Sequence, residues 1–355
     1  MREDGAPEDR VECGVDGRVS TPVEDASVIR SLLAPDAVLA AVRSGYVVGS
    51  LDECTLIRAL INDVYLLAGP DEQYVFKVYR PEWRDIPALL WEVDLLAHLS
   101  RQGAPVAPAI ARRDGCAITA FAAPEGTRHG VLFAYARGSK PSPPFEADLY
   151  HAFGGAAAVI HQRSDGFVSP YRRQPLDLST LIDQPLRAIR PFLAHRPADW
   201  AYVVNLGERV RAGVLALAEE GLDWGVCHQD MTLDNVHVAR DGHVICYDFD
   251  SGGPGWRALD LQGIYADALY YRNDHWDAFL RGYSEVRQLG RADLAAIPYF
   301  GLAYAFWGTH MAIVRSRWHG AHYLNDGYFD ERIGQEGWWR RWETEHLPGW
   351  VEDPV

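Results

Sequence analysis

The sequence predicts an α+β fold with two lobes, in which a small antiparallel sheet is followed by a larger, mainly helical lobe. Three short runs of strand-forming residues lie between residues 54 and 79, whereas the apolar spacing after residue 145 is mostly helical. The segment 138–144, Gly-Ser-Lys-Pro-Ser-Pro-Pro, is the clearest linker and separates the two patterns. We therefore expect an acidic, disordered tail over residues 1–25, a sheet lobe over 26–137 and a helical lobe over 138–355.

Composition narrows the class of protein. A chain of 355 residues with 48% hydrophobic content can bury the cores of two lobes. The net charge of −15 argues against a nucleic-acid-binding surface, because phosphate backbones are bound by clustered Lys and Arg. Five cysteines without C-x-x-C spacing suggest neither a disulfide framework nor a zinc site. No apolar segment has the length of a signal-peptide core or a membrane span, so we expect a cytoplasmic enzyme with no membrane partner.

The elements of the sheet lobe follow from local patterns. Apolar positions between residues 25 and 43 predict one or two amphipathic helices, broken near Pro35. The first strands should form a meander, joined in part by the turn Gly69-Pro70-Asp71-Glu72. The predicted strands cover residues 54–60, 64–68, 74–79, 117–121 and 131–135. A helix is expected at 86–101, between the third and fourth strands.

Lysine usage points to one residue of the third strand. The chain has 34 basic residues, and only Lys77 and Lys140 are lysines. Lys77 lies in the apolar run 75–79, where an ammonium group is costly unless it meets an anion. The functional interpretation is a contact with nucleotide phosphates, and the alternative is a solvent-facing lysine on an edge strand. We favour the phosphate contact because lysine is so rare here.

The second half of the chain predicts helices at 146–161 and 202–220. The first is rich in Ala and Gly, which permits close packing against another helix. Between them, residues 163–185 form an irregular, polar stretch that we expect to line an acceptor cleft. Half of the twelve tryptophans follow residue 300; they form either an aromatic wall for a ligand or ordinary helix packing, and we favour packing.

The most informative segment begins at His228. It has the pattern H-x-D-x-x-x-x-N, with Asp230 and Asn235, and is followed by two β-like runs and a D-x-D at Asp248 and Asp250. Phosphoryl transfer requires a carboxylate that receives the proton of the acceptor hydroxyl, which Asp230 can supply. It also requires oxygen ligands for magnesium, which Asn235 and Asp248 can supply. The alternative is a polar loop with a capping aspartate.

This segment resembles the catalytic loop and metal-binding segment of the aminoglycoside phosphotransferase and choline kinase superfamily. Among these small-molecule relatives of protein kinases, it is most similar to the bacterial stress-response Ser/Thr kinases. The resemblance implies a bilobal protein-kinase-like fold with ATP and Mg²⁺ as cofactors. The family usually has Gly after the His, and often before the Asn, where this chain has Gln229 and Asp234.

The resemblance also assigns expected roles. Glu92, fifteen residues after Lys77, should pair with that lysine, and Asn62 should lie in the glycine-free turn that covers the phosphates. The backbone of the hinge 133–137, including Ala134 and Ala136, should meet the adenine edge. The remaining assignments are structural: His228 holds the loop backbone, Asp250 braces the loop or touches a second metal, with bracing preferred, and Asp260 caps a helix or braces the loop.

The leading hypothesis is a kinase that transfers the γ-phosphoryl group of ATP to a hydroxyl of a small molecule. A Ser or Thr of a protein partner, or of a ribosomally made peptide before dehydration, is an alternative acceptor. A non-catalytic pseudokinase scaffold is a further alternative, which a missing lysine or metal ligand would favour. Both the lysine and the metal ligands are present in this sequence.

Overall fold

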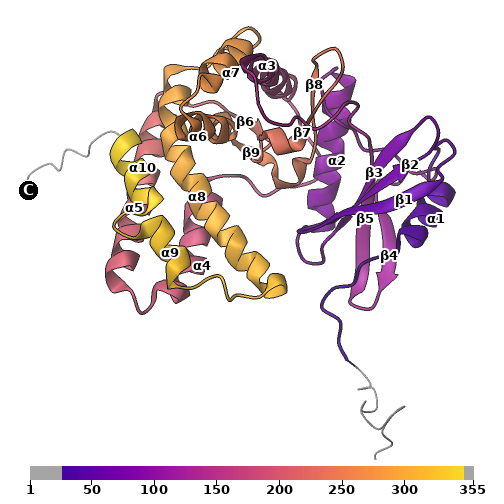
Figure 1. The fold of residues 1–355 in the computed structure, drawn as a ribbon, viewed down its shortest axis with the longest axis horizontal. Coiled ribbons are helices and arrows are strands. Elements are labelled where there is room, and N and C mark those ends of the chain that lie inside the picture. The colour runs from indigo at the N-terminus through magenta and orange to yellow at the C-terminus, as the bar shows by residue number, and fades with distance from the viewer. Residues whose placement is uncertain (1–25, 348–355) are drawn as a thin grey trace, which may run out of the picture.

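The sheet lobe is built on five antiparallel strands in the order β1-β2-β3-β5-β4 (Figure 1). The computed structural model describes residues 26–347, so the expected tail lies outside the described residues. The strands are β1 Glu53–Ala59, β2 Asp63–Ala68, β3 Gln73–Tyr79, β4 Thr119–Ala123 and β5 Gly126–Ala134. All five predicted strands are present, with ends shifted by a few residues.

Side-chain alternation gives the sheet two different faces. Tyr65 and Leu67 of β2, with Phe76 and Val78 of β3, pack into a small core beneath α1 (Pro35–Gly45). The intervening residues point to the opposite face, where Lys77 pairs in register with Val64 of β2. Lys77 is therefore on the face turned away from α1.

The helix at the start of the sheet lobe differs from the prediction. It begins at Pro35 instead of breaking there, and residues 26–34 have no regular helix. The reason is that proline at the first helical position lacks only an N–H that would have no partner in the helix, so Pro can start a helix as well as interrupt one. Val28, Ile29 and Leu32 accordingly stay exposed.

Helix α2 (Ile86–Arg101) connects the sheet to the rest of the protein. Asp85 caps it by accepting a hydrogen bond of 2.9 Å from the backbone N–H of Ala88. Its buried face, which includes Leu95, Leu96 and Leu99, belongs to the large core of the helical lobe and not to the core beneath α1. The position of Glu92 on α2 is thus set jointly by the two lobes.

The helical lobe contains the remaining long helices (Figure 1). They are α3 Ala147–Arg163, α4 Gln184–Ile189, α5 Pro197–Glu219, α6 Gln262–Tyr271, α7 His275–Ser284, α8 Arg291–His319, α9 Asp326–Ile333 and α10 Trp338–His346. Helices α3 and α7 approach closely through glycines: a Cβ on Gly154 would overlap the carbonyl oxygen of Phe279, and one on Gly282 that of His151. This confirms the close packing expected for the first helix of this lobe.

The C-terminal tryptophans divide between packing and a pocket. Trp339 is buried against Phe306, and the Trp342 indole donates to the carbonyl of Pro298 at 2.9 Å. Trp307 lines a pocket, and Trp318 stacks on Arg80 of the sheet lobe. Trp350 lies outside the described residues.

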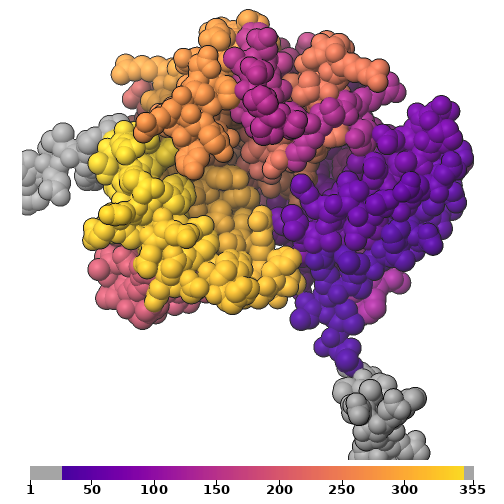
Figure 2. All heavy atoms as spheres, in the orientation of Figure 1, coloured from indigo at the N-terminus to yellow at the C-terminus, as the bar shows by residue number. Residues whose placement is uncertain are grey.

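Two small antiparallel ribbons hold the segment that starts at His228. One pairs β6 (Trp224–Cys227) with β9 (Gly253–Trp256), and the other pairs β7 (Val236–Val238) with β8 (Val244–Cys246). Residues 228–235 connect the two ribbons, and residues 247–252 return from the second to the first. Figure 2 shows the sheet lobe, in indigo, lying directly against the helical lobe. No helix within residues 26–347 is long and apolar enough to cross a membrane.

Candidate active site

Lys77 and Asp248, from different lobes, meet at one point. The Nζ of Lys77 lies 3.0 Å from Oε1 of Glu92 and 3.1 Å from Oδ1 of Asp248. Lys77 and Glu92 are buried, whereas the side chain of Asp248 is 37% exposed. The competing acid on α2, Asp94, instead accepts a hydrogen bond from Ser169. The structure therefore brings together the lysine, the helical glutamate and the aspartate that the sequence had suggested.

The electrostatics of this group keep the lysine charged. Burial alone would lower the pKa of Lys77, but the charge of Glu92, followed by Tyr79 and Asp248, outweighs burial and raises the pKa well above its ordinary value. A fixed ammonium is thus present at neutral pH between two carboxylates. Such a group can neutralise the phosphates of a nucleotide.

A cavity of about 320 Å³ adjoins Lys77, Glu92 and Asp248. Its lining comes from the sheet face opposite α1, including Val75 and Phe133, and from Leu96 of α2. The apolar lining is Ile57, Val64, Leu66, Val75, Leu96, Ala107 and Phe133. An apolar slot with a charged end of this kind suits a planar base joined to phosphates.

The expected hinge lines the same cavity, through Ala134, Tyr135 and Ala136. The backbone N–H of Ala134 donates to the carbonyl of Pro108 at 2.9 Å, and the carbonyl of Ala136 lies 2.6 Å from the His237 ring. The N–H of Ala136 has no hydrogen-bond partner within residues 26–347. The contact of these residues with adenine stays a prediction, with the Ala136 N–H as its available donor.

Asn62 and Asp250 are placed differently from expectation. The Asn62 side chain is buried, accepts from the Arg80 N–H at 3.2 Å and donates to Oδ2 of Asp250 at 2.8 Å. Asp250 also accepts from Trp83 at 2.7 Å, so its carboxylate contacts the sheet lobe and not residues 228–235. The preferred bracing of the catalytic loop by Asp250 is therefore corrected to a link between lobes. The cause is local, because the short 3₁₀ turn Phe249–Ser251 directs residue 250 toward the sheet.

Asp260 holds the catalytic loop. Its carboxylate accepts the backbone N–H groups of His228 and Gln229, both at 2.6 Å, so of the two expected structural roles the structure shows the brace. It also lies 3.0 Å from the His161 ring, whose other nitrogen is 2.8 Å from the Tyr283 hydroxyl. This buried network links the loop to α3 and α7 and orients the two amides.

His228 fixes the loop from the inside. Its Nε2 lies 3.0 Å from the carbonyl oxygen of Tyr247 and donates to it. Its Nδ1 then accepts the backbone N–H of Asp230 at 3.3 Å. The ring thus joins the loop to the end of β8, as expected for a residue that holds the backbone.

Asp230 faces Asn235 and Tyr304. The Asn235 Nδ2 donates to Oδ2 of Asp230 at 2.7 Å and to the Asp230 carbonyl at 2.9 Å. On α8, burial and the adjacent Asp230 carboxylate raise the pKa of Tyr304, so its phenol stays protonated at neutral pH. The carboxylate of Asp230 is therefore held between an amide and a phenol, which orients it.

The oxygens around Asp248 fit a divalent cation. Asn235 uses Nδ2 for Asp230, so its Oδ1 is left as a ligand, and the carboxylate of Asp248 opens on the cavity. The Asn235 carbonyl accepts the Tyr247 N–H at 3.0 Å, which holds Asn235 beside the residues that follow β8, next to Asp248. Amide and carboxylate oxygens suit Mg²⁺.

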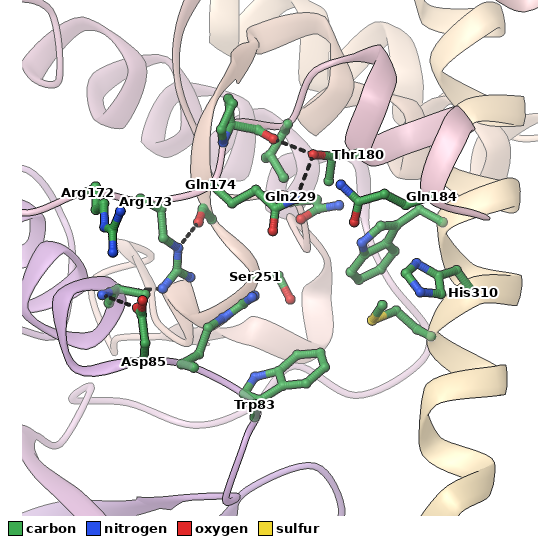
Figure 3. A pocket seen from close by; sticks show the side chains of 17 residues that line it. Trp83, Asp85, Arg172, Arg173, Gln174, Thr180, Gln184, Gln229, Ser251 and His310 are labelled. Carbon is green, nitrogen blue, oxygen red and sulfur yellow. Dashed lines mark hydrogen bonds between the residues drawn. The ribbon is translucent and has the colours of Figure 1, made fainter. Parts of the chain in front are cut away.

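A second pocket, of about 540 Å³, lies on the other side of the catalytic loop (Figure 3). It is lined by Gln229 and Ser251 from the two ends of the site, by Trp83 and Arg84 of the sheet lobe, and by Trp307 of α8. The predicted irregular stretch contributes Arg172, Arg173, Gln174, Pro175, Leu176, Thr180 and Gln184. Helical structure begins within that stretch, at Ser179.

Comparison with known proteins identifies the family of the chain. Residues 53–297 match the phosphotransferase enzyme family, a span of more than half of the chain. The chain belongs to this family. The phosphotransferase is 34% identical over 338 residues to an uncharacterised protein of Deinococcus radiodurans, with 92% of this chain and 95% of the relative covered.

Two further comparisons concern characterised proteins. The phosphotransferase is 26% identical over 278 residues to a homoserine kinase of Granulibacter bethesdensis, with 74% of this chain and 81% of the relative covered. The structure of an amicoumacin kinase with AMP-PNP, Ca²⁺ and Ami matches with a TM-score of 0.65 at 21% identity, over 79% of this chain and 86% of that chain. The predicted bilobal kinase-like fold is confirmed by this likeness.

Sequence reasoning missed three residues of the phosphotransferase site. His161, Tyr304 and Trp83 contact Asp260, Asp230 and Asp250 respectively. Each lies on an element far in sequence from its partner, and none stands in a motif. Lys77 could be found because lysine is scarce in this sequence, whereas His161, Tyr304 and Trp83 have no such distinguishing feature.

Proposed function

We propose that this phosphotransferase moves the γ-phosphoryl group of ATP to a hydroxyl of a small molecule, with Mg²⁺ as the metal. The observation that carries the proposal is the convergence of Lys77, Glu92 and Asp248 at the charged end of an apolar cavity. Lys77, held by Glu92, neutralises the phosphates, and the cavity beside Ala136 takes the base.

Asp230 positions the acceptor hydroxyl and takes its proton. As the acceptor oxygen forms its bond to the γ-phosphorus, the bond from that phosphorus to the bridging oxygen breaks and ADP leaves. Asn235 and Tyr304 orient the Asp230 carboxylate, and Asp260 and His228 fix the backbone that carries it.

Asn235 and Asp248 would hold the metal through their side-chain oxygens. When bound, Mg²⁺ supplies neutralisation of charge on the phosphates. The fit rests on the free Oδ1 of Asn235 and on the opening of Asp248 toward the cavity.

A small-molecule acceptor is favoured over the alternatives. The relatives compared above are named for homoserine and amicoumacin, both small molecules, which favours such an acceptor over a Ser or Thr of a protein or peptide. A pseudokinase would be favoured by a missing lysine or metal ligand, and this chain retains Lys77, Asn235 and Asp248.

The test compares Asp230→Asn with Asp241→Asn, an exposed aspartate in the turn between β7 and β8. Each protein is incubated with ATP, Mg²⁺ and either a panel of small hydroxyl compounds or polypeptides that contain Ser and Thr, and products are followed by mass spectrometry. We expect Asp230→Asn to lose at least about a hundredfold in transfer, in line with loss of a general base, while its nucleotide binding by calorimetry is unchanged. Transfer that survives in Asp230→Asn would remove the proposed role, and phosphate found only on added polypeptides would overturn the small-molecule acceptor.

A further inference from the structure

The pocket beside the catalytic loop has a charge opposite to that of the protein. Its lining contains three arginines, Arg84, Arg172 and Arg173, and one acid, Asp85, in a chain whose net charge is −15. Asp85 is occupied in capping α2 through the Ala88 N–H. A pocket of this composition repels cationic ligands and attracts anionic ones.

The three arginines differ in how many hydrogen bonds their guanidinium groups already make to other protein groups. The guanidinium of Arg173 is buried and donates to the carbonyls of Gly252, Ala88 and Asp250. Arg84 donates to the Asp250 carbonyl through Nε and Nη2. Arg172 is exposed on the pocket and has no hydrogen bond or ion pair within residues 26–347. Its whole guanidinium fork is therefore available to a ligand.

A buried amide donor next to the catalytic residue is also without a partner. Gln229 is 2% exposed and lines the pocket, and its Nε2 has no hydrogen-bond partner in the part of the chain that the structure describes. Leaving such a donor unpaired is unfavourable, so a ligand oxygen that reaches it gains a favourable contact. Figure 3 shows Gln229 and Ser251 in the middle of the pocket, between the arginines and His310.

The rest of the lining sets the character of the ligand. Trp83, Trp307 and Met311 supply apolar walls. Burial, with help from Arg187 and Arg317, lowers the pKa of His310, so the imidazole adds no positive charge at neutral pH. One free guanidinium with neutral donors matches a single negative charge on planar oxygens, which is a carboxylate, better than a dianionic phosphate.

The lining of the pocket includes neighbours of Asp230 and Tyr304. Gln229 precedes Asp230 directly, and the ring of Trp307 lies 5.4 Å from that of Tyr304, which faces Asp230. We propose that the acceptor is a hydroxy acid with an apolar body, whose carboxylate is bound by Arg172 and whose hydroxyl reaches Asp230 past the Gln229 amide. This specificity rests on the proposed phosphotransferase function.

The test uses four matched benzyl alcohols that differ only in the group opposite the hydroxymethyl. They are the carboxylate para-(hydroxymethyl)benzoate, the neutral diol para-xylylene glycol, the cationic para-(hydroxymethyl)benzylamine and the anionic para-(hydroxymethyl)phenylphosphonate. Binding to the full chain is measured by calorimetry with AMP-PNP and Mg²⁺ present, and transfer is measured separately with ATP.

We expect the benzoate to bind at least about tenfold more tightly than the glycol and the amine, and no less tightly than the phosphonate, because a charge-assisted pair to arginine is a strong contact. Arg172→Gln should abolish the preference, and Arg172→Glu should shift it toward the amine. Arg113→Gln, an exposed arginine of the sheet lobe, should leave it unchanged.

Three results would overturn the carboxylate site: no measurable binding of the benzoate, equal binding of the benzoate, glycol and amine, or a preference that persists in Arg172→Gln. Tighter binding of the phosphonate would overturn the choice of carboxylate. The two proposals fail separately. If Asp230-dependent transfer to the glycol occurs without any charge preference, the phosphotransferase proposal stands and the hydroxy-acid proposal fails. If no compound is phosphorylated but binding of the benzoate depends on Arg172, the carboxylate site stands and the phosphotransferase proposal fails.

Discussion

Asn62 and Asp250 are 188 residues apart in sequence and are joined by a buried hydrogen bond of 2.8 Å. Asn62 lies in the turn between β1 and β2, and Asp250 lies two residues after Asp248 in the helical lobe. Trp83 reaches the same carboxylate at 2.7 Å. The lobes are therefore linked directly beside the group formed by Lys77, Glu92 and Asp248.

The first prediction tests this link. Asn62→Ala removes a donor to a buried carboxylate and leaves the Arg80 N–H without its acceptor, so we expect a loss of about 1–3 kcal/mol in the free energy of unfolding. Urea denaturation followed by circular dichroism measures the change. Asn205→Ala, at an exposed position of α5, serves as the control and should change stability little. Equal stabilities of the two variants would show that the link contributes nothing.

A second prediction concerns acid. Burial alone would raise the pKa of Asp250, but the charges of Lys77, Arg84 and Arg173 outweigh burial and hold the pKa below its ordinary value. A carboxyl group of this kind stabilises the fold above its unfolded pKa of about 3.9 and loses that contribution as the pH falls through its folded pKa.

We therefore expect the wild type to be more stable than Asp250→Asn at neutral pH, and the difference in unfolding free energy to shrink below about pH 4. Urea titrations of both proteins across the acid range measure it. A difference that stays constant from neutral to strongly acidic pH would contradict the assignment.

A third prediction compares the two lysines. Lys77→Met leaves Glu92 buried without its partner and removes the ammonium from the phosphate end of the cavity, so transfer should fall by at least about a hundredfold. Lys140 pairs with Asp234 at 2.7 Å, but its side chain is 43% exposed. Lys140→Met should lower kcat/KM by less than about threefold, because exposed ion pairs contribute little. Steady-state kinetics with ATP distinguishes these outcomes, and similar losses in both variants would argue against a special role of Lys77.

The fourth prediction concerns backbone strain at residue 229. Gln229 has φ of 66°, in the left-handed region that a side chain disfavours. Gln229→Gly should therefore be more stable than Gln229→Ala by about 1 kcal/mol, since both remove the amide but only glycine relieves the strain. Thermal and urea denaturation compare the pair directly. An alanine variant as stable as the glycine variant would mean that the position is not strained.

The residues that could be predicted are those with a local pattern. The apolar run 75–79 and the scarcity of lysine identified Lys77, and the resemblance assigned Glu92, fifteen residues later on the helix that follows. The loop at Asp230 and Asn235 carries its own motif. In each case the candidate functional residues lie within one short segment, or in two elements that follow each other directly in the sequence.

Other features could not be predicted because they depend on how distant elements pack. Tyr304 lies beside Asp230 only because α8 crosses the catalytic loop, and His161 reaches Asp260 across 99 residues of sequence. The phosphate role expected for Asn62 overlooked Asp250 as a partner for the same reason. Pro35 was misread because proline both starts and interrupts helices, and local sequence does not decide between these effects.

The scarcity of lysine gives the protein an experimental use. Amine-directed reagents have only two side chains to modify, and one of these, Lys77, is buried behind Glu92 and Asp248 while the other is half open to solvent. An amine-reactive ester of a fluorophore should therefore label Lys140, which lines the apolar cavity, in addition to the α-amino group. An optical reporter can thus be placed at the cavity that we propose binds the nucleotide, without any mutation.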